Sequence, residues 1–207
     1  LTSLEHPHIV PIYHYGVVAT ECTYIAMRLM HGSLQQRLQE APLPAERVID
    51  IALQLIDGLN YAHKKGVIHH DIKPANILFD EAGSACLTDF GLSNVTQLSL
   101  DTHEIDTVVK TAMYAAPEKI RNASTDHRSD IYSLGVIMYQ MLTGRLPFDV
   151  DDLSITSMLR TIEVDEPIPL RSLVPDIPVE LERVVMQALR KEPRQRFFDA
   201  AEMMEAL

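Results

Sequence analysis

Four polar side chains gather in and after the stretch HHDIKPANILFD, residues 69–80. Asp71, Lys73 and Asn76 precede one apolar, strand-like segment, and Asp89 follows the next. The turn-like DEAGS between ILF and ACLT predicts a hairpin of two short strands. Because such strands run out and back, we expect Asn76 and Asp89 to return to one end, within reach of Asp71 and Lys73.

These residue types match the needs of phosphoryl transfer. Oxygen ligands from Asn76 and Asp89 would form a Mg²⁺ site that phosphates and water complete. Asp71 would accept a proton from a substrate hydroxyl, and Lys73 would neutralise charge on the transferred group. A protein core gains nothing from burying four such groups together, so we favour the functional interpretation over the structural one.

The elements that would position these groups fall into two parts. Residues 8–18 and 22–30 are rich in β-branched residues and tyrosine, which predicts two strands. We place the junction near residues 28–32, where Gly32 breaks the pattern. Residues 44–65 carry apolar positions at spacings of three and four, which predicts an amphipathic helix.

The rest of the chain is predicted to be mostly helical. GVIHH at 66–70 predicts one more strand, and residues 92–110 predict a loop. Residues 129–143 are apolar nearly all round, which predicts a buried central helix. Residues 149–207 predict helices separated by proline-rich breaks. We therefore expect the α+β class, with a small β part before a large helical part.

Composition and charge limit the kinds of molecule that this chain is expected to bind. The 207 residues carry a formal charge of −11, which argues against nucleic acid or an anionic membrane as the main partner. Cys22 and Cys86 are far apart and form no CxxC pattern, which fits a reducing, cytoplasmic location. There is no membrane-length apolar run or signal peptide. The chain starts at Leu1 in mid-element, so we expect a fragment of a longer protein.

Several motifs in order resemble those of protein kinases across the whole chain. HHDIKPAN resembles the catalytic loop H-R-D-x-x-x-x-N, and TDFG at 88–91 resembles the metal-binding DFG. The other matches are HPHIV, the hinge-like YIAMRLMHGSL, AAPE at 115–118, the central helix SDIYSLGVIMYQMLTGRLPF and the late arginine motif RKEPRQRF. Lys73 and Thr111 are similar to the residues that Ser/Thr-specific kinases carry at these places. The motifs taken together resemble those of the bacterial Hanks-type kinases.

The resemblance implies a division of the fold and a set of catalytic roles. Residues 1–30 would be a remnant of the N-lobe, with the end of helix C, two strands and the hinge, and residues 31–207 would be the C-lobe. ATP and Mg²⁺ would be the cofactors, and Ser/Thr hydroxyls of proteins the acceptors. The catalytic positions would be Asp71 as base, Lys73 on the γ-phosphate, Asn76 and Asp89 on Mg²⁺, and Thr111 before the APE.

The family also implies residues that hold the nucleotide and brace the site. Arg28 and Met30 would offer backbone groups to adenine, with Met27 as gatekeeper behind it and Leu78 beneath it. The bracing positions would be Ile12, His69 and Phe90 in a regulatory spine, Asp130 under the catalytic loop, and Arg196 paired with Glu118.

Two departures from the family pattern qualify this assignment. No GxGxxG is present, and the first lysine is Lys64, so the phosphate-clamping loop, strand lysine and helix-C glutamate would lie upstream. One lost charge contact to a transition state costs about 3 kcal/mol, so we expect this chain alone to be nearly inactive. His70 replaces the arginine that reads a phosphorylated activation loop, which predicts weak dependence on phosphosites such as Ser99, Thr102 or Thr107.

Three alternatives stay open on the sequence. A pseudokinase would use the fold to bind partners without catalysis, although Asp71, Asn76 and Asp89 are intact. A small-molecule phosphotransferase shares an H-x-D-x-x-x-x-N core, although Lys73 and the APE segment favour a protein substrate. A truncated gene product could act as an interaction domain. Dimerisation and the identity of the substrates are left open.

Overall fold

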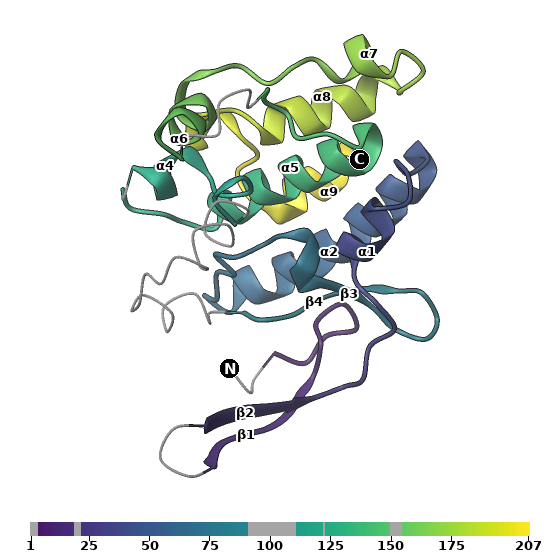
Figure 1. Cartoon of the computed structure of the whole chain (residues 1–207), viewed down its shortest axis with the longest axis vertical. Coiled ribbons are helices and arrows are strands. Elements are labelled where there is room, and N and C mark those ends of the chain that lie inside the picture. The colour runs from purple at the N-terminus through teal and green to yellow at the C-terminus, as the bar shows by residue number, and fades with distance from the viewer. Residues whose placement is uncertain (1–3, 19–21, 91–110, 122, 150–154) are drawn as a thin grey trace.

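A computed structural model describes residues 4–18, 22–90, 111–121, 123–149 and 155–207. Ser99, Thr102 and Thr107, the candidate phosphosites, lie outside the described residues, as does the loop expected at 92–110. Two small antiparallel sheets lie on one side of a larger group of helices (Figure 1). This arrangement confirms the α+β class that the sequence predicts.

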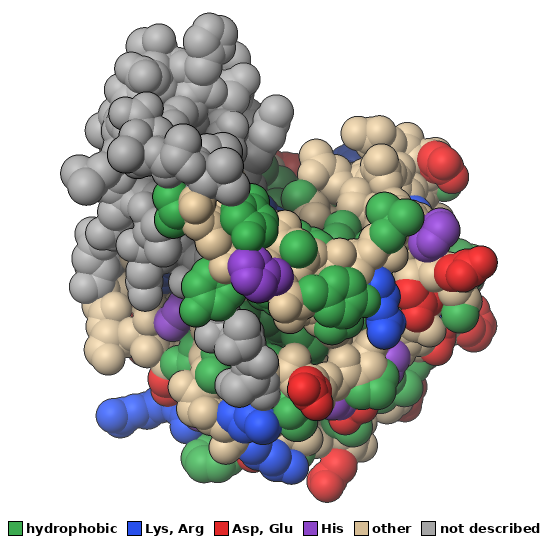
Figure 2. Space-filling model, turned by 90° about the horizontal axis from the view of Figure 1, so that it is seen from below, with side chains coloured by type: hydrophobic (Ala, Val, Ile, Leu, Met, Phe, Trp, Pro, Cys, Tyr) green, Lys and Arg blue, Asp and Glu red, His purple; other side chains and the backbone are tan. Residues whose placement is uncertain are grey.

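The first sheet is the hairpin of β1 (Ile12–Val18) and β2 (Cys22–Met27). Successive residues of a strand face opposite sides, and Tyr15 and Val17 on one side of β1 are 59% and 67% exposed. Figure 2 views the molecule from below Figure 1, the end where this hairpin lies, and shows hydrophobic side chains over the middle of that face. The two predicted strands are thus confirmed, with slightly tighter limits than the sequence indicates.

The second sheet, β3 (Ile77–Phe79) with β4 (Ala85–Leu87), is the hairpin predicted around DEAGS. Its outer edges are both covered by other segments. The Val10 N–H donates to the Leu87 carbonyl at 2.8 Å, and the His31 N–H donates to the Phe79 carbonyl at 2.7 Å. The chain before β1 and the segment after β2 therefore both attach to this small sheet.

Helix α2 (Ala45–Lys64) matches the helix predicted at 44–65. Its apolar stripe is fully buried, from Val48 at 0% exposed to Ala62 at 0% exposed. That face packs against β4, α5 (Arg128–Thr143) and α9 (Ala200–Ala206). The predicted stripe is therefore the surface that joins the hairpin sheet to the helical part.

Helix α5 is the predicted central helix and is buried along nearly its whole length. A Cβ on Gly135 would lie 2.8 Å from the Cβ of Ala188 on α8 (Val179–Ala188), so glycine permits the close crossing of these helices. Gly144 ends α5 in a left-handed conformation, with φ of 72°. The core of the helical part is built around this helix.

The C-terminal region is helical with proline breaks, as predicted. The remaining elements are α1 (Leu34–Leu38), η1 (Pro74–Asn76), α4 (Pro117–Ile120), α6 (Ile155–Val164), α7 (Leu170–Leu173) and η3 (Pro193–Gln195). Within the described ranges, none of the helices combines the length and apolarity needed to span a bilayer.

Two local expectations are corrected. GVIHH is not a strand, because the N–H groups of His69 and His70 donate to the Asp130 side chain instead of a neighbouring strand. Helix α1 was not predicted, although Ser33 and Gln36 form the reciprocal capping box that marks a helix start. Residues 4–11 contain no helix, so the expected end of helix C is not among the described residues.

Candidate active site

The structure brings Asp71, Lys73 and Asn76 into direct contact. The Asn76 Nδ2 donates to Asp71 Oδ2 at 3.0 Å and to the Asp71 carbonyl at 2.8 Å. The Lys73 Nζ lies 2.8 Å from the same Oδ2 atom. Pro74 starts the short helix η1 between them, and its fixed φ suits a first helical position. One carboxylate oxygen of Asp71 is thus held by a cation and an amide.

Asn76 and Asp89 lie at the same end of the β3–β4 hairpin. The Thr88 N–H donates to the Asn76 carbonyl at 3.0 Å, one residue beyond the last strand pair. Asp89 itself has φ of 64°, a left-handed conformation that non-glycine residues rarely adopt. Such a conformation costs about 1–3 kcal/mol and is typical of functional sites. The predicted convergence of the two hairpin ends is therefore present.

Thr111 also belongs to this cluster. The Lys73 Nζ donates to Thr111 Oγ1 at 3.3 Å while it contacts Asp71. The lysine thus links the carboxylate to the segment that precedes α4. Lys73 and Thr111 also line a cavity of about 440 Å³ with Gln35, Gln140 and six other residues.

Asp130 holds the backbone of the loop that leads to Asp71. Its two carboxylate oxygens accept the backbone N–H groups of His69 and His70, each at 2.9 Å, and Oδ2 also lies 2.8 Å from the His63 Nε2. Burial acts to raise the Asp130 pKa, but the hydrogen bond from His63 and the neighbouring histidines outweigh it, and the pKa is lowered. The predicted brace is confirmed, and His63 is a partner that the sequence did not reveal.

The predicted adenine-contacting segment lies at the end of β2. The Arg28 N–H donates to the Pro11 carbonyl at 3.1 Å, so this group is already engaged. No hydrogen bond engages the Met30 N–H within the described ranges. Met27, Arg28, Met30 and Leu78 line one cavity of about 590 Å³. Met27 is 36% exposed.

The spine residues predicted at this site are partly in contact. The rings of His69 and Phe90 pack with centroids 4.4 Å apart. Phe90 and Ile12 line a common cavity of about 240 Å³, which also includes Asp89. Burial lowers the pKa of His69, so this imidazole is neutral at pH 7. The packed rings of His69 and Phe90 therefore lie beside Asp71, whose N–H donates to the His69 Nδ1 at 3.3 Å.

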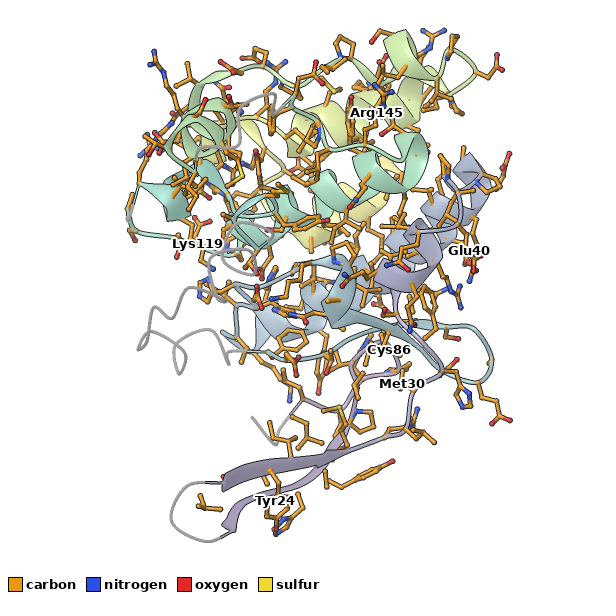
Figure 3. All side chains as sticks on the ribbon, in the orientation of Figure 1. Tyr24, Met30, Glu40, Cys86, Lys119 and Arg145 are labelled. Atoms are coloured by element: carbon orange, nitrogen blue, oxygen red, sulfur yellow. The ribbon has the colours of Figure 1, made fainter. Side chains whose placement is uncertain are left out.

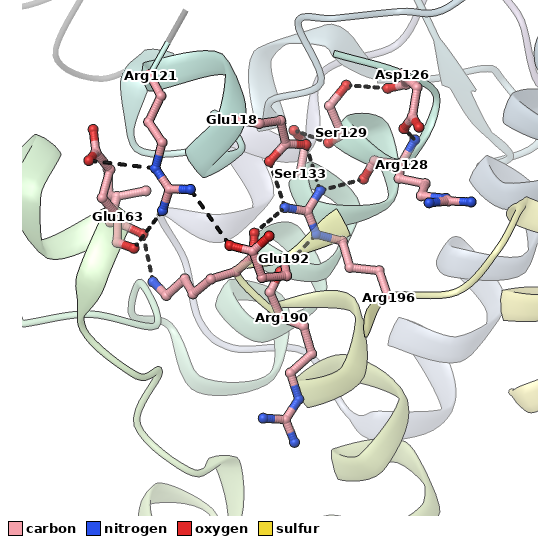
Figure 4. Close-up of polar contacts among 12 residues, drawn as sticks. Glu118, Arg121, Asp126, Arg128, Ser129, Ser133, Glu163, Arg190, Glu192 and Arg196 are labelled. Atoms are coloured by element: carbon pink, nitrogen blue, oxygen red, sulfur yellow. Dashed lines mark hydrogen bonds and ion pairs between the residues drawn. The ribbon is translucent and has the colours of Figure 1, made fainter. Parts of the chain in front are cut away.

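Glu118 and Arg196 form the ion pair that the sequence predicts. Two parallel hydrogen bonds of 2.7 Å join the guanidinium to the carboxylate in the interior (Figure 4). Nearby, Arg121 makes looser contacts of 3.7 Å with Glu163 and Glu192. The buried pair anchors α4 to the segment that carries η3, and so fixes the end of the segment that contains Thr111.

Lys119, on α4, is a second residue that sequence reasoning missed. Its Nζ donates to the backbone carbonyl of His70, which directly precedes Asp71. The contact joins positions 49 residues apart, and no local pattern in the sequence signals it.

Comparison with known proteins shows the family to which this chain belongs. A model of the protein kinase domain family matches residues 1–206. The chain therefore belongs to the protein kinase domain family, whose members typically bind ATP and usually a divalent metal.

Bacterial serine/threonine-protein kinases are among the proteins that this chain is similar to. The chain is 35% identical over 206 residues to serine/threonine-protein kinase PknB of Mycobacterium leprae, covering 97% of this chain and 33% of that protein. It is 33% identical over 207 residues to serine/threonine-protein kinase PrkC of Bacillus subtilis, covering 99% of this chain and 31% of that protein. The chain thus spans about a third of the length of these curated relatives. The resemblance drawn from the motifs is confirmed.

Proposed function

We propose that the complete gene product containing this chain transfers the γ-phosphate of ATP to Ser and Thr hydroxyls of proteins. The observation that supports this most directly is the contact set of Asp71, Lys73 and Asn76. Residues 1–30 would contribute the remnant of the N-lobe and residues 31–207 the C-lobe. A cytoplasmic location, where ATP is available, belongs to the same proposal.

Asp71 would orient the substrate hydroxyl and receive its proton. The Oδ2 atom is engaged by Lys73 and Asn76, whereas no described residue hydrogen-bonds to Oδ1. The free oxygen is therefore the one that would face the hydroxyl. The substrate oxygen would bond to the γ-phosphorus as the bond to the bridging oxygen breaks and ADP leaves, while the proton passes to Asp71.

Lys73 would hold charge on the transferring phosphoryl group. It already bridges Asp71 and Thr111, so its ammonium is fixed before substrate arrives. A preorganised cation stabilises developing charge without reorganisation at the moment of reaction. The cavity beside Lys73 and Thr111 would admit the substrate segment, which favours a protein over a small acceptor.

Asn76 and Asp89 fit a hard, oxygen-preferring cation such as Mg²⁺. The Asn76 Nδ2 is fully used by Asp71, which leaves the Oδ1 atom as an oxygen donor. The Asp89 carboxylate begins at the same hairpin end, and one or two protein oxygens are the usual share of a Mg²⁺ site. The metal, when bound, supplies neutralisation of charge on the phosphate oxygens.

The adenine would lie in the cavity at the end of β2. The Met30 N–H and the Arg28 carbonyl are backbone groups that an adenine edge would pair with, since the Arg28 N–H is engaged by Pro11. Met27 and Leu78 line the same cavity and would contact the ring. This arrangement would place the triphosphate towards Asp89.

The test is transfer of radiolabelled γ-phosphate by the complete gene product, followed by phosphoamino acid analysis. We expect phosphoserine and phosphothreonine on a generic protein substrate, and loss of labelling when EDTA removes divalent metal. Labelling of small-molecule acceptors alone would favour the small-molecule phosphotransferase. Mg-ATP binding without any transfer would favour the pseudokinase.

A further inference from the structure

Lys119 connects helix α4 to the catalytic loop through the backbone of that loop. Its Nζ donates to the His70 carbonyl at 2.5 Å, and His70 directly precedes Asp71. Figure 3 shows Lys119 on the side of α4 that is turned towards the β3–β4 hairpin. Its side chain is partly buried, unlike that of an ordinary surface lysine.

The backbone of His70 needs this kind of support. Its φ is 65°, in the left-handed region that non-glycine residues rarely adopt. A residue keeps such a conformation only where its surroundings determine it. Here the His70 N–H donates to Asp130 Oδ1 at 2.9 Å, and the His70 carbonyl accepts from Lys119. Two charged side chains thus hold both polar backbone groups of one unusual residue.

Helix α4, which carries Lys119, is also held in place. The preceding residue, Glu118, is bound by two hydrogen bonds to buried Arg196, so α4 cannot shift easily. Burial lowers the pKa of Lys119, while the carboxylates of Asp71 and Asp130 raise it in part. The charged form of Lys119 is therefore stabilised by the carboxylates of Asp71 and Asp130 and by the His70 carbonyl that it contacts.

We propose that Lys119 is a positioning residue that holds Asp71 in its catalytic orientation by clamping the His70 carbonyl. The inference rests on the proposed kinase function and extends it to a residue outside the catalytic loop. Among the described residues, Lys119 forms no hydrogen bond with a side chain proposed to meet substrate, and its hydrogen bond to this loop is made to the His70 carbonyl. The clamp is a fixed side chain, so it is present without any modification of the protein.

The experiment compares Lys119→Met, Lys119→Arg and a control, Lys64→Met, in the complete gene product. Lys64 is an exposed lysine at the end of α2. We expect Lys119→Met to lower kcat at least tenfold with the KM for ATP within twofold of wild type. Lys119→Arg, which keeps a cationic donor, should recover at least a third of wild-type kcat. Lys64→Met should leave both values unchanged.

Hydrogen–deuterium exchange separates positioning from a loss of folding. In Lys119→Met, exchange should rise in the peptide covering residues 67–76 and stay unchanged in α5. Exchange that rises equally in α5 would mean a general loss of stability and would overturn the proposal. So would a Lys119→Met protein with wild-type kcat.

The two proposals fail in different ways. If wild type transfers no phosphate, the kinase function fails, while exchange in residues 67–76 still tests the clamp. If wild type is active and Lys119→Met matches it, only the clamp fails.

Discussion

The carboxylate of Glu118 and the guanidinium of Arg196 form two parallel hydrogen bonds of 2.7 Å in the protein interior, 78 residues apart in the chain. Arg196 is 4% exposed and also donates to the backbone carbonyls of Arg128, Arg190 and Lys191. One side chain therefore ties α4 to the start of α5 and to the segment before α9.

Replacing Glu118 by glutamine should strongly destabilise the domain. The change leaves the Arg196 charge buried without its counter-ion, which costs about 3–5 kcal/mol. Chemical denaturation of the complete gene product measures the free energy of unfolding. Glu163→Gln is the matched control, because its contact with Arg121 is long and partly exposed and should contribute about 0–1 kcal/mol. Equal effects of the two changes would contradict this account.

The Glu118–Arg196 pair illustrates what the sequence could predict. The resemblance to protein kinases implied this pair and the Asp130 brace, whereas the residue types and their spacing predicted the cluster around Asp71. The helices at α2 and α5 followed from their apolar patterns. Each of these features depends on local composition or on a family motif.

Features that depend on tertiary partners could not be predicted in the same way. GVIHH has the composition of a strand, but the Asp130 carboxylate takes the N–H groups that a strand would pair. Lys119 meets His70 only through the fold. Helix α1 is different, since its capping box of Ser33 and Gln36 was visible in the sequence.

Removing the Thr111 hydroxyl should slow phosphate transfer moderately. Thr111→Ala deletes the acceptor for Lys73, a hydrogen bond that contributes about 1 kcal/mol, or roughly fivefold in kcat. Thr111→Ser keeps the Oγ atom and should retain most of the activity. Steady-state kinetics of the complete gene product check this, and an active alanine variant beside an inactive serine variant would refute it.

Stability should fall in mild acid because His69 is buried and neutral. Burial lowers its pKa in the folded state, whereas the unfolded state binds a proton near pH 6.5. The unfolded state therefore binds more protons as pH falls below that value, and the free energy of unfolding decreases by up to about 1.4 kcal/mol per pH unit.

His69→Phe should remove this part of the pH dependence. Phenylalanine can still pack on Phe90, and the charged groups near position 69, Asp71 and Asp130, are unchanged. His6, the other histidine among the described residues whose pKa burial lowers, is present in both proteins. Denaturation curves between pH 5 and 7 measure the difference. Identical slopes for the variant and wild type would show that His69 is not the group responsible.

Cys86 should resist alkylation in the folded protein. Burial, assisted by Asp80 and opposed by Arg28, raises the pKa of its thiol to about 11. The thiolate is the reactive form, and only about one Cys86 thiol in a thousand is ionised at pH 8, which slows the reaction. Mass spectrometry after iodoacetamide treatment distinguishes Cys86 from Cys22. Labelling of Cys86 should be at least a hundredfold slower than in denaturant, and equal rates would contradict the burial seen here.

Phosphate incorporation by the complete gene product carrying Asp71→Asn tests the central claim most directly. The substitution preserves size and removes the proton acceptor, so we predict a fall of at least a hundredfold. Asp57→Asn, at an exposed position of α2, is the control and should keep wild-type activity. Equal incorporation by wild type and Asp71→Asn would contradict the assignment of this cluster as the site of phosphoryl transfer.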